Sequence, residues 1–284
     1  MDPDPEAEQA ASQILKTAFI SVVFTACHYH TKTTIPLHSS QKTVIIAAPP
    51  AVNKPHAAAV KKKKNIIYLT FDDGPNRGTR KVMHIAEEEK VPITMFIVGE
   101  HVYASAYQRQ TWDSISACPM IEICNHSYSH AHNRYLDFYS EPDSVTSDFT
   151  RCADSLKFSN TICRAPGRNI WRTENVSSTD IKSSEAAADS LHKLGYELVG
   201  WDLEWHYDEK SLRLQTDADS LLRQIGIMFK RGRTKNAGHL VLLAHDQVYE
   251  NTDDSAQLHS FISQLKNNDE YQLELVSKYP GIKN

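Results

Sequence analysis

The sequence lacks a strong charge of either sign. Its 31 Lys and Arg residues are nearly balanced by 35 Asp and Glu residues, which gives a formal net charge of -4. Proteins that bind nucleic acid through its phosphates usually carry a basic face or a basic domain. The composition therefore predicts no nucleic-acid partner, and it gives no electrostatic case for a strongly anionic one.

Cysteine is also scarce, with five residues in the chain and no CxxC spacing. Because cysteine-based zinc sites are usually built from such pairs, this absence argues against one. Four cysteines lie beyond the N-terminal part, and they allow up to two disulfides in an oxidising compartment. They are equally suited to be small buried apolar residues, and the sequence leaves both interpretations open: Cys118, Cys124, Cys152 and Cys163.

The N-terminal part has no hydrophobic run long enough to span a bilayer. Its apolar stretch TAFISVVFTA, at residues 17–26, has ten residues, whereas a membrane-spanning helix needs about 20. This length favours the core of a secretion signal, and the FTAC ending is similar to a bacterial lipoprotein lipobox. We therefore expect residues 1–27 to be an export segment with Cys27 as a candidate lipid anchor, and the protein to lie in the periplasm or cell envelope. A short buried helix or strand is the alternative.

The composition changes after the export segment. Residues 28–64 end in AAPPAVNKPHAAAVKKKK, which is rich in Pro, Ala and Lys. Such a composition is typical of a flexible linker. The sequence thus predicts one catalytic domain over residues 65–280, tethered by this linker.

Short apolar runs alternate with amphipathic segments throughout the predicted domain. The amphipathic segments have apolar residues three and four positions apart, which indicates one buried helical face. Alternation of strands and helices predicts an α/β fold with a mostly parallel sheet, either closed as a barrel or open and doubly wound. Seven strands are predicted: 66–71, 93–98, 120–124, 161–164, 197–202, 239–244 and 271–276.

Polar clusters stand at the ends of five of these strands. In parallel α/β folds the functional groups gather at the carboxyl ends of the strands. We therefore expect the clusters to meet at one site, although an isolated Asp-Asp-Gly is more often an acidic turn or a helix cap. The clusters are Asp72 and Asp73, NHSYSH at 125–130, Arg164, WDLEW at 201–205, and His245 with Asp246.

His126 and His130 are four residues apart. On one helical turn this spacing places both imidazoles on the same side, where they can bind one metal ion, and Asp73 is the natural third ligand. Two nitrogens and one carboxylate leave positions for water and a substrate oxygen, which suits metal-assisted hydrolysis. Such a reaction needs a base and an acid, for which Asp72 and His245 are the candidates.

These motifs together resemble the NodB-homology polysaccharide deacetylases, the family 4 carbohydrate esterases. The resemblance covers about residues 65–280 and rests on TFDDGP, HSYSH, RAPGR, WDLEW and LLAHD, in that order. It implies a distorted (β/α)7 barrel and one divalent ion, with Zn2+ preferred over Co2+ or Mn2+. It also implies Asp72 as base; Asp73, His126 and His130 as metal ligands; Arg164 as the residue that orients the base; His245 as acid; and the Gly167 backbone N–H as an oxyanion donor.

The fourth motif differs from the usual Asp-Trp pair of this family. Asp202 and Glu204 share strand parity, so either can be the partner of His245, and we prefer Asp202. Trp205 is the expected apolar wall of the sugar site, with Trp201 as the alternative. An aromatic residue is common in the family at the position of Gly167, so the substrate groove is expected to differ in shape.

The predicted function is removal of N-acetyl groups from an acetylated amino-sugar polysaccharide such as peptidoglycan, a chitin-like polymer or an exopolysaccharide. One alternative is an O-acetyl esterase on acetylated xylan, which the same site would serve. A second is a catalytically inert, sugar-binding cell-wall protein. Loops set the choice of polymer, so the sequence predicts neither the polymer nor the oligomeric state.

Overall fold

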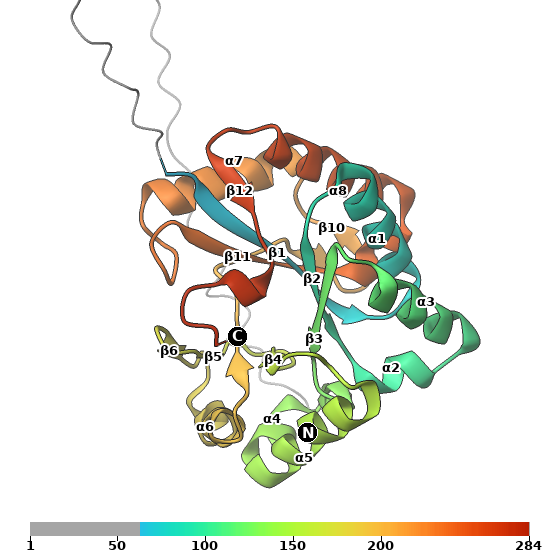
Figure 1. Cartoon of the computed structure of the whole chain (residues 1–284), viewed down its shortest axis with the longest axis vertical. Helices are drawn as coiled ribbons and strands as arrows, with labels where there is room; N and C mark the ends of the chain where they lie inside the picture. The colour runs from blue at the N-terminus through green and yellow to red at the C-terminus, as the bar shows by residue number, and fades with distance from the viewer. Residues whose placement is uncertain (1–62, 284) are drawn as a thin grey trace, which may run out of the picture. The chain divides into compact units, whose positions relative to one another are not determined.

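The predicted strands form one curved sheet in the computed structural model, which describes residues 63–283 (Figure 1). Each of the seven predicted strand ranges contains one strand, so the predicted α/β alternation is confirmed. A separate two-stranded hairpin consists of β9 (Tyr207–Asp208) and β10 (Arg213–Leu214). The main sheet contains β1 (Asn65–Gly74), β2 (Ile93–Ile97), β3 (Ile121–Asn125), β4 (Ile162–Cys163), β5 (Trp171–Arg172), β6 (Ser177–Ser178), β7 (Glu197–Leu198), β8 (Leu203–Glu204), β11 (His239–His245) and β12 (Tyr271–Leu273).

Strand pairing traces a curled, open sheet with β1 near its middle. β1 pairs in parallel with β2, which continues through β3 to β4. Residues 197–204 then connect the two halves, because β7 pairs with β4 whereas β8 pairs with β11. β11 pairs with β1 along Ile66–Asp72. The predicted distorted barrel is thus confirmed, and its distortion lies at residues 199–202, where the chain leaves β4 and joins β11.

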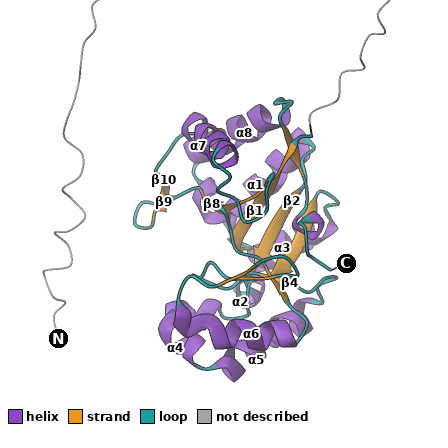
Figure 2. Ribbon diagram, turned by 90° about the vertical axis from the view of Figure 1, so that its left-hand side faces the viewer, coloured by secondary structure: helices purple, strands orange, loops and turns teal. Residues whose placement is uncertain are grey.

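Helices cover the outside of the sheet. Figure 2 shows α7 and α8 beside the upper part of the strands, and α4, α5 and α6 together below them. Asn76 begins α1 with a capping box in which its side chain accepts from the Thr79 N–H. The helices are α1 (Arg77–Glu89), α2 (Gly99–Tyr103), α3 (Ala106–Ala117), α4 (Tyr135–Ser140), α5 (Pro142–Leu156), α6 (Glu185–Lys193), α7 (Ala218–Lys230) and α8 (Thr252–Lys266), with 3-10 turns η1 (His130–Asn133), η2 (Lys182–Ser184), η3 (Asp246–Glu250) and η4 (Val276–Lys278).

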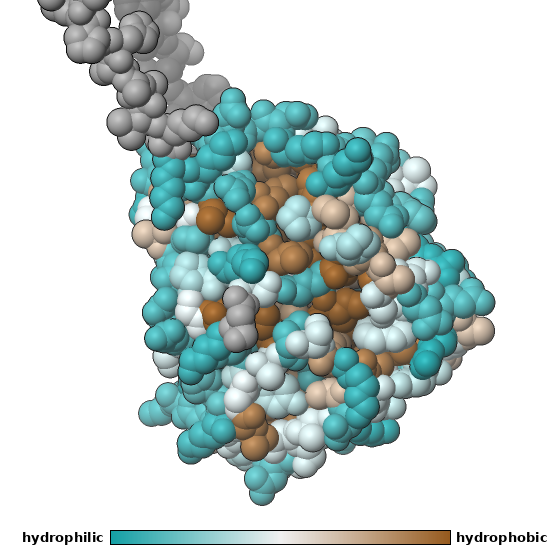
Figure 3. Space-filling view, viewed as in Figure 1, coloured by the Kyte–Doolittle hydropathy of each residue, from teal (hydrophilic) through white to brown (hydrophobic). Residues whose placement is uncertain are grey.

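The core lies between the strands and these helices. Ile67 and Leu69 of β1 are buried and belong to the same apolar cluster as Val82 and Ala86 of α1, as the helical period predicts. The face in Figure 3 has hydrophobic residues near its middle and hydrophilic ones around them. Among the described residues, no helix has the length and apolar content needed to cross a bilayer. Four cysteines are buried and unpaired, in line with the apolar interpretation: Cys118, Cys124, Cys152 and Cys163.

The predicted export segment, 1–27 with Cys27, lies outside the described residues, and so does the predicted linker except for its last two residues, 63 and 64.

Candidate active site

A cleft of about 880 Å3 opens at the carboxyl ends of β1, β3 and β11. The polar clusters predicted from the sequence meet here, as expected for parallel strands. Arg164 lies beneath the cleft and is fully buried. Six of the predicted site residues line it: Asp72, Asp73, His126, His130, Gly167 and His245.

A bulge in β1 turns Asp72 and Asp73 toward the same cleft. The β1–β2 register shifts between Asp72 and Gly74, so Asp73 is the extra residue. Its φ of +78° lies in the left-handed region, and its carbonyl oxygen is 2.7 Å from His101 Nδ1. The bulge therefore overrides the alternation of a regular strand, which would place the two carboxylates on opposite faces.

His126 and His130 approach each other without sharing a helical turn, so that part of the prediction is wrong. His126 comes directly after the end of β3, and His130 begins η1 with a φ of +50°. Side chains hold the intervening loop: Ser127 Oγ accepts from the His130 N–H, and Asp148 Oδ2 accepts from two loop N–H groups. The two imidazole centroids are 5.1 Å apart.

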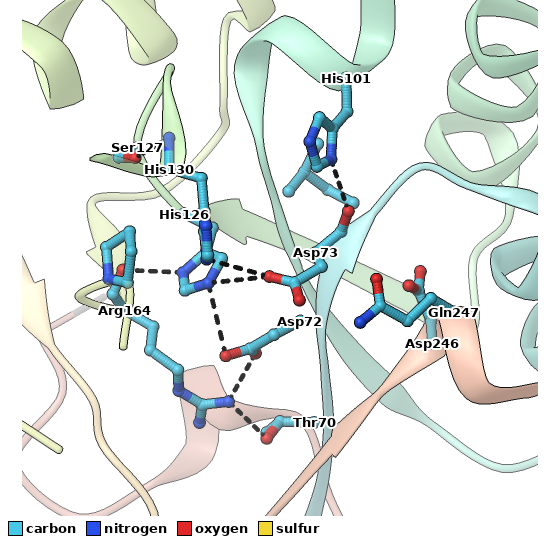
Figure 4. A network of polar contacts seen from close by, with 12 residues as sticks. Thr70, Asp72, Asp73, His101, His126, Ser127, His130, Arg164, Asp246 and Gln247 are labelled. Atoms are coloured by element: carbon cyan, nitrogen blue, oxygen red, sulfur yellow. Dashed lines mark hydrogen bonds and ion pairs between the residues drawn. The ribbon is translucent and has the colours of Figure 1, made fainter. Parts of the chain in front are cut away.

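Asp73, His126 and His130 converge on a single point (Figure 4). Asp73 Oδ1 is 3.2 Å from His130 Nε2 and 3.5 Å from His126 Nε2. Ligands about 2.1 Å from a tetrahedral zinc ion lie about 3.4 Å apart, so these separations fit a shared cation. Asp73 Oδ1 is buried without a hydrogen-bond partner in the protein, which is consistent with a ligand atom.

A backbone hydrogen bond on the side away from Asp73 orients the His126 ring. Its Nδ1 lies 3.0 Å from the carbonyl oxygen of Arg164, which can only accept a hydrogen bond. The proton therefore resides on Nδ1, and the lone pair of Nε2 points to Asp73. Such a backbone partner is the usual way in which proteins fix the tautomer of a metal-binding histidine.

Electrostatics favour an ionised Asp73. Burial alone would raise the pKa of Asp73, but the imidazoles of His126 and His130 and the positive charge of His245 hold it well below its usual range. Burial would lower the pKa of His126, but the nearby carboxylates of Asp72 and Asp73 raise it. The site is therefore prepared for positive charge at the point where the three side chains meet.

Asp72 is held by Arg164 rather than by the histidine pair. Arg164 Nη1 donates to Asp72 Oδ1 at 2.8 Å, and both side chains are almost completely buried. The same nitrogen donates to Thr70 Oγ1, while Arg164 Nε and Nη2 donate to the carbonyl oxygens of Val199 and Gly200. Arg164 thus connects Asp72 to the irregular segment at residues 199–202.

His245 lines the cleft, and its Nδ1 is buried without a hydrogen-bond partner. The prediction that Asp202 is its partner is wrong. The carboxylate of Asp202 accepts from the N–H groups of Lys235 and Val241, at the amino end of β11. Glu204 does line the cleft, but its carboxylate lies 3.4 Å from His206 Nδ1.

Trp205 does not form the apolar wall, so this prediction is also wrong. Its side chain is 1% exposed and packs against Tyr249 and Phe261 in the core. Trp201, the alternative, lines the cleft. The two tryptophans do not behave as strand neighbours because residues 199–202 belong to no regular strand.

Gly167 has a φ of +61°, and a Cβ there would lie 2.9 Å from the ring of Tyr135. The positive φ and the close packing of Tyr135 therefore both require glycine at this position. Tyr135 also packs edge-on against His130, with ring centroids 5.8 Å apart. The first residue of α4 thus places an aromatic ring beside the glycine.

Further residues that the sequence analysis did not assign also line the cleft. His101 is identified as a site residue only by its contact with the Asp73 carbonyl oxygen, and no pattern in the sequence indicated it. Tyr207 belongs to the β9–β10 hairpin, and its ring lies 5.0 Å from that of His245. Arg168 comes directly after Gly167 in the RAPGR motif, which was the only sequence signal for it.

Comparison with known proteins supports the resemblance predicted from the motifs. Residues 59–172 match the family model described as polysaccharide deacetylase. A chitooligosaccharide deacetylase from Rhizobium leguminosarum bv. trifolii is 51% identical over 37 residues, which are 13% of this chain and 17% of that protein. A bifunctional xylanase/xylan deacetylase from Cellvibrio japonicus is 25% identical over 139 residues, which are 48% of this chain and 18% of that protein.

The fold agrees with a solved structure of similar extent. The catalytic domain of a peptidoglycan N-acetylglucosamine deacetylase from Eubacterium rectale superposes with a TM-score of 0.53 at 19% identity. The superposition covers 81% of this chain and all of that domain. The matched stretches span less than a fifth of the length of the two curated relatives.

Proposed function

Since this chain carries a polysaccharide deacetylase domain of the NodB-homology type, we propose that it is a metal-dependent hydrolase. Its substrate would be a polysaccharide that contains N-acetylglucosamine, from which it removes N-acetyl groups. The observation that carries the proposal is the convergence of Asp73, His126 and His130 on one point, beside an Asp72 that is bound by Arg164 instead.

The first three residues would hold the ion. A divalent cation bound by Asp73, His126 and His130 would act as a Lewis acid on the acetyl carbonyl. Zinc suits two imidazoles and one carboxylate, and cobalt or manganese can take the same ligands. His126 enters this set already oriented by the Arg164 carbonyl.

Asp72 would take the proton from the attacking water. The guanidinium of Arg164 keeps its Oδ1 in place, which leaves Oδ2 as the oxygen that faces the cleft beside His126 Nε2, at 3.6 Å. This oxygen is therefore placed where a general base could take a proton from water.

Gly167 and His245 would act on the other side of the reacting group. The N–H of Gly167, which lines the cleft, would donate to the oxyanion. His245 would give a proton to the leaving nitrogen, for which an imidazolium is suited near neutral pH. Its register partner across the β1–β11 pair is Asp72, so base and acid lie on adjacent strands.

The N-acetyl substrate is tested by acetate release from tetra-N-acetylchitotetraose and from acetylated xylan, each with and without a chelator. We expect release from the amino-sugar oligomer, its loss after complete metal removal, and its recovery when zinc is added back. Equal release before and after metal removal would contradict the metal role.

O-acetyl esterase activity is the second candidate, because a xylan deacetylase is among the matched relatives. An alcohol leaves more readily than an amine, so the same groups would serve. Faster release from acetylated xylan than from the amino-sugar oligomer would favour it. The complete set of candidate base, acid and ligands argues against an inert sugar-binding protein. Action outside the cytoplasm, in the cell envelope, is part of the proposal.

A further inference from the structure

Three arginines are buried among the described residues, and only one of them has no carboxylate as an ion-pair partner. Arg164 pairs with Asp72, and Arg172 Nε lies 2.7 Å from Asp189 Oδ1. Arg168, with 9% of its surface exposed, forms no ion pair with any described residue. A buried charge is costly unless an opposite charge or a full set of hydrogen bonds accompanies it, so this guanidinium stands out.

The contacts of Arg168 leave part of its guanidinium unused. Nη1 donates to the Gly167 carbonyl at 2.8 Å, and Nε donates to Ser184 Oγ at 3.3 Å. The rings of Tyr135 and Tyr139 lie 5.6 and 5.5 Å from its Cζ. Among the described residues, no hydrogen bond uses Nη2. The exposed remainder of the side chain faces the cleft, because Arg168 lines it.

A carboxylate is the ligand that this arrangement fits. The guanidinium is planar and always charged, and its paired N–H groups match the two oxygens of a carboxylate. The guanidinium packs against two tyrosine rings, so it is held in place before a ligand arrives, which reduces the entropy cost of binding. The chain has nearly equal numbers of acidic and basic residues, which argues against a long polyanion as the ligand. One cation in a cleft is suited to recognise a single acidic group.

The position of Arg168 places this acidic group beside the reacting acetyl group. Arg168 is the next residue after Gly167, the candidate oxyanion donor. The ring of Tyr135 contacts both Arg168 and the candidate ligand His130. A carboxylate at Arg168 therefore belongs to the reacting sugar or its neighbour in the polymer.

We propose that Arg168 binds a carboxylate of the substrate, so that the cleft selects an acidic acetylated polysaccharide over a neutral one. The proposal rests on the proposed function for the reaction itself. Two sources supply this chemistry in acetylated polymers: a lactyl ether on an amino sugar, as in N-acetylmuramic acid, and a uronic acid branch.

The first experiment compares substrates that differ in one charge. Acetate release is measured on a peptide-free tetramer of alternating N-acetylglucosamine and N-acetylmuramic acid, and on its lactyl methyl ester. The second arm uses acetylated xylo-oligosaccharides with and without a glucuronic acid branch. We expect kcat/KM for one free acid to exceed that of its neutral counterpart by about tenfold or more, as a hydrogen-bonded ion pair would give. Equal values in both arms would overturn the proposal.

Variants then assign the preference to Arg168. In Arg168→Gln we expect the ratio of kcat/KM for the acid substrate to kcat/KM for its neutral counterpart to fall to about one. Arg168→Lys keeps the charge and should retain part of the preference. Lys182→Gln, which removes an exposed charge, is the matched control and should retain all of it. A purely structural role, in which the tyrosine rings alone stabilise the guanidinium, predicts equal losses on acidic and neutral substrates.

Calorimetry separates this proposal from the proposed function. The affinities of the free-acid tetramer and its methyl ester are measured with wild type and Arg168→Gln, independently of turnover. If no oligosaccharide releases acetate but the free acid binds more tightly through Arg168, the carboxylate site stands and the proposed reaction fails. If acetate is released but acid and ester bind equally, the carboxylate site is disproved and the reaction stands.

Discussion

Asp72 on β1 and His245 on β11 are register partners in adjacent parallel strands. Their side chains reach the same cleft, although Asp72 is bound by Arg164 while His245 Nδ1 has no hydrogen-bond partner in the protein. The candidate base is thus fixed by the surrounding structure, and the candidate acid is left with an unused ring nitrogen. This asymmetry suits groups with different tasks, since a base is kept ionised whereas an acid must exchange its proton.

Asp72→Asn should separate binding of the ion from turnover. The amide can still accept a hydrogen bond from Arg164, and the three candidate ligands are untouched, so metal affinity is expected to persist. Loss of a general base lowers kcat by about 10² to 10⁴. Metal content and single-turnover acetate release measure the two effects. Full activity in this variant would assign the base to another group.

Asp73→Ala and His130→Ala should abolish tight metal binding. Even partners of metal ligands change affinity by about 10 to 100-fold, so removal of a ligand should exceed this range. Titration of the metal-free protein with Co2+, monitored by absorbance, gives the affinity without reference to activity. His132→Ala is the matched control, because His132 contacts Glu100 and is largely exposed. If His132→Ala weakened binding as much as His130→Ala, the ligand assignment would be wrong.

Trp205→Ala should mainly lower stability, whereas Trp201→Ala should mainly weaken substrate binding. Trp205 is buried against Tyr249 and Phe261, so truncation should lower the free energy of unfolding by about 3 to 5 kcal/mol. Trp201 lines the cleft, so its truncation should mainly raise KM for oligosaccharides, with a smaller loss of stability. Urea unfolding and steady-state kinetics on both variants provide the comparison. A core-like loss of stability in Trp201→Ala, with an unchanged KM, would argue against its place in the sugar site.

Asp246 gives the protein a pH dependence of stability. Burial raises its pKa to about 7, although Asn76 and Thr79 donate hydrogen bonds to its carboxylate. The folded state therefore holds the proton more tightly than the unfolded chain, in which the pKa of Asp is about 3.9. The resulting stabilisation is complete below about pH 4 and is lost as the pH rises to about 7.

Asp246→Asn removes this titration. In metal-free protein, wild type should lose up to about 4 kcal/mol of unfolding free energy, relative to the variant, as the pH rises from 4 to 8. Denaturant unfolding at several pH values measures this difference. A constant difference across the range would show that Asp246 keeps an ordinary pKa.

Much of the site was predictable because its main residues end regular strands. The apolar run of β1 leads directly into Asp72 and Asp73, and LLAHD ends β11 at His245. Parallel strands bring such ends together whatever the loops do. This rule was enough to predict the convergence of the candidate ligands.

Predictions failed where strand or helix periodicity was assumed beyond the regular elements. Residues 197–202 were predicted to be one strand, and shared parity kept both Asp202 and Glu204 as candidate partners of His245. The chain leaves β4 after Leu198, so alternation no longer decides which side chains face the cleft. The spacing of His126 and His130 suggested a helical turn, yet a loop with left-handed residues produces the same convergence. Arg168 lies in a loop and Tyr135 begins α4, and the packing between them depends on tertiary contacts that local sequence does not encode.

Arg164 donates to the carbonyl oxygens of Val199 and Gly200, in the irregular segment between β7 and β8, and it donates to Asp72 with the same guanidinium. One side chain thus supports both this irregular segment and the carboxylate of the candidate base. A substitution at residue 164 that is meant to alter the candidate base would therefore also weaken the packing of the segment at 199–202, so new activities in this scaffold are better sought at Tyr135 and Arg168.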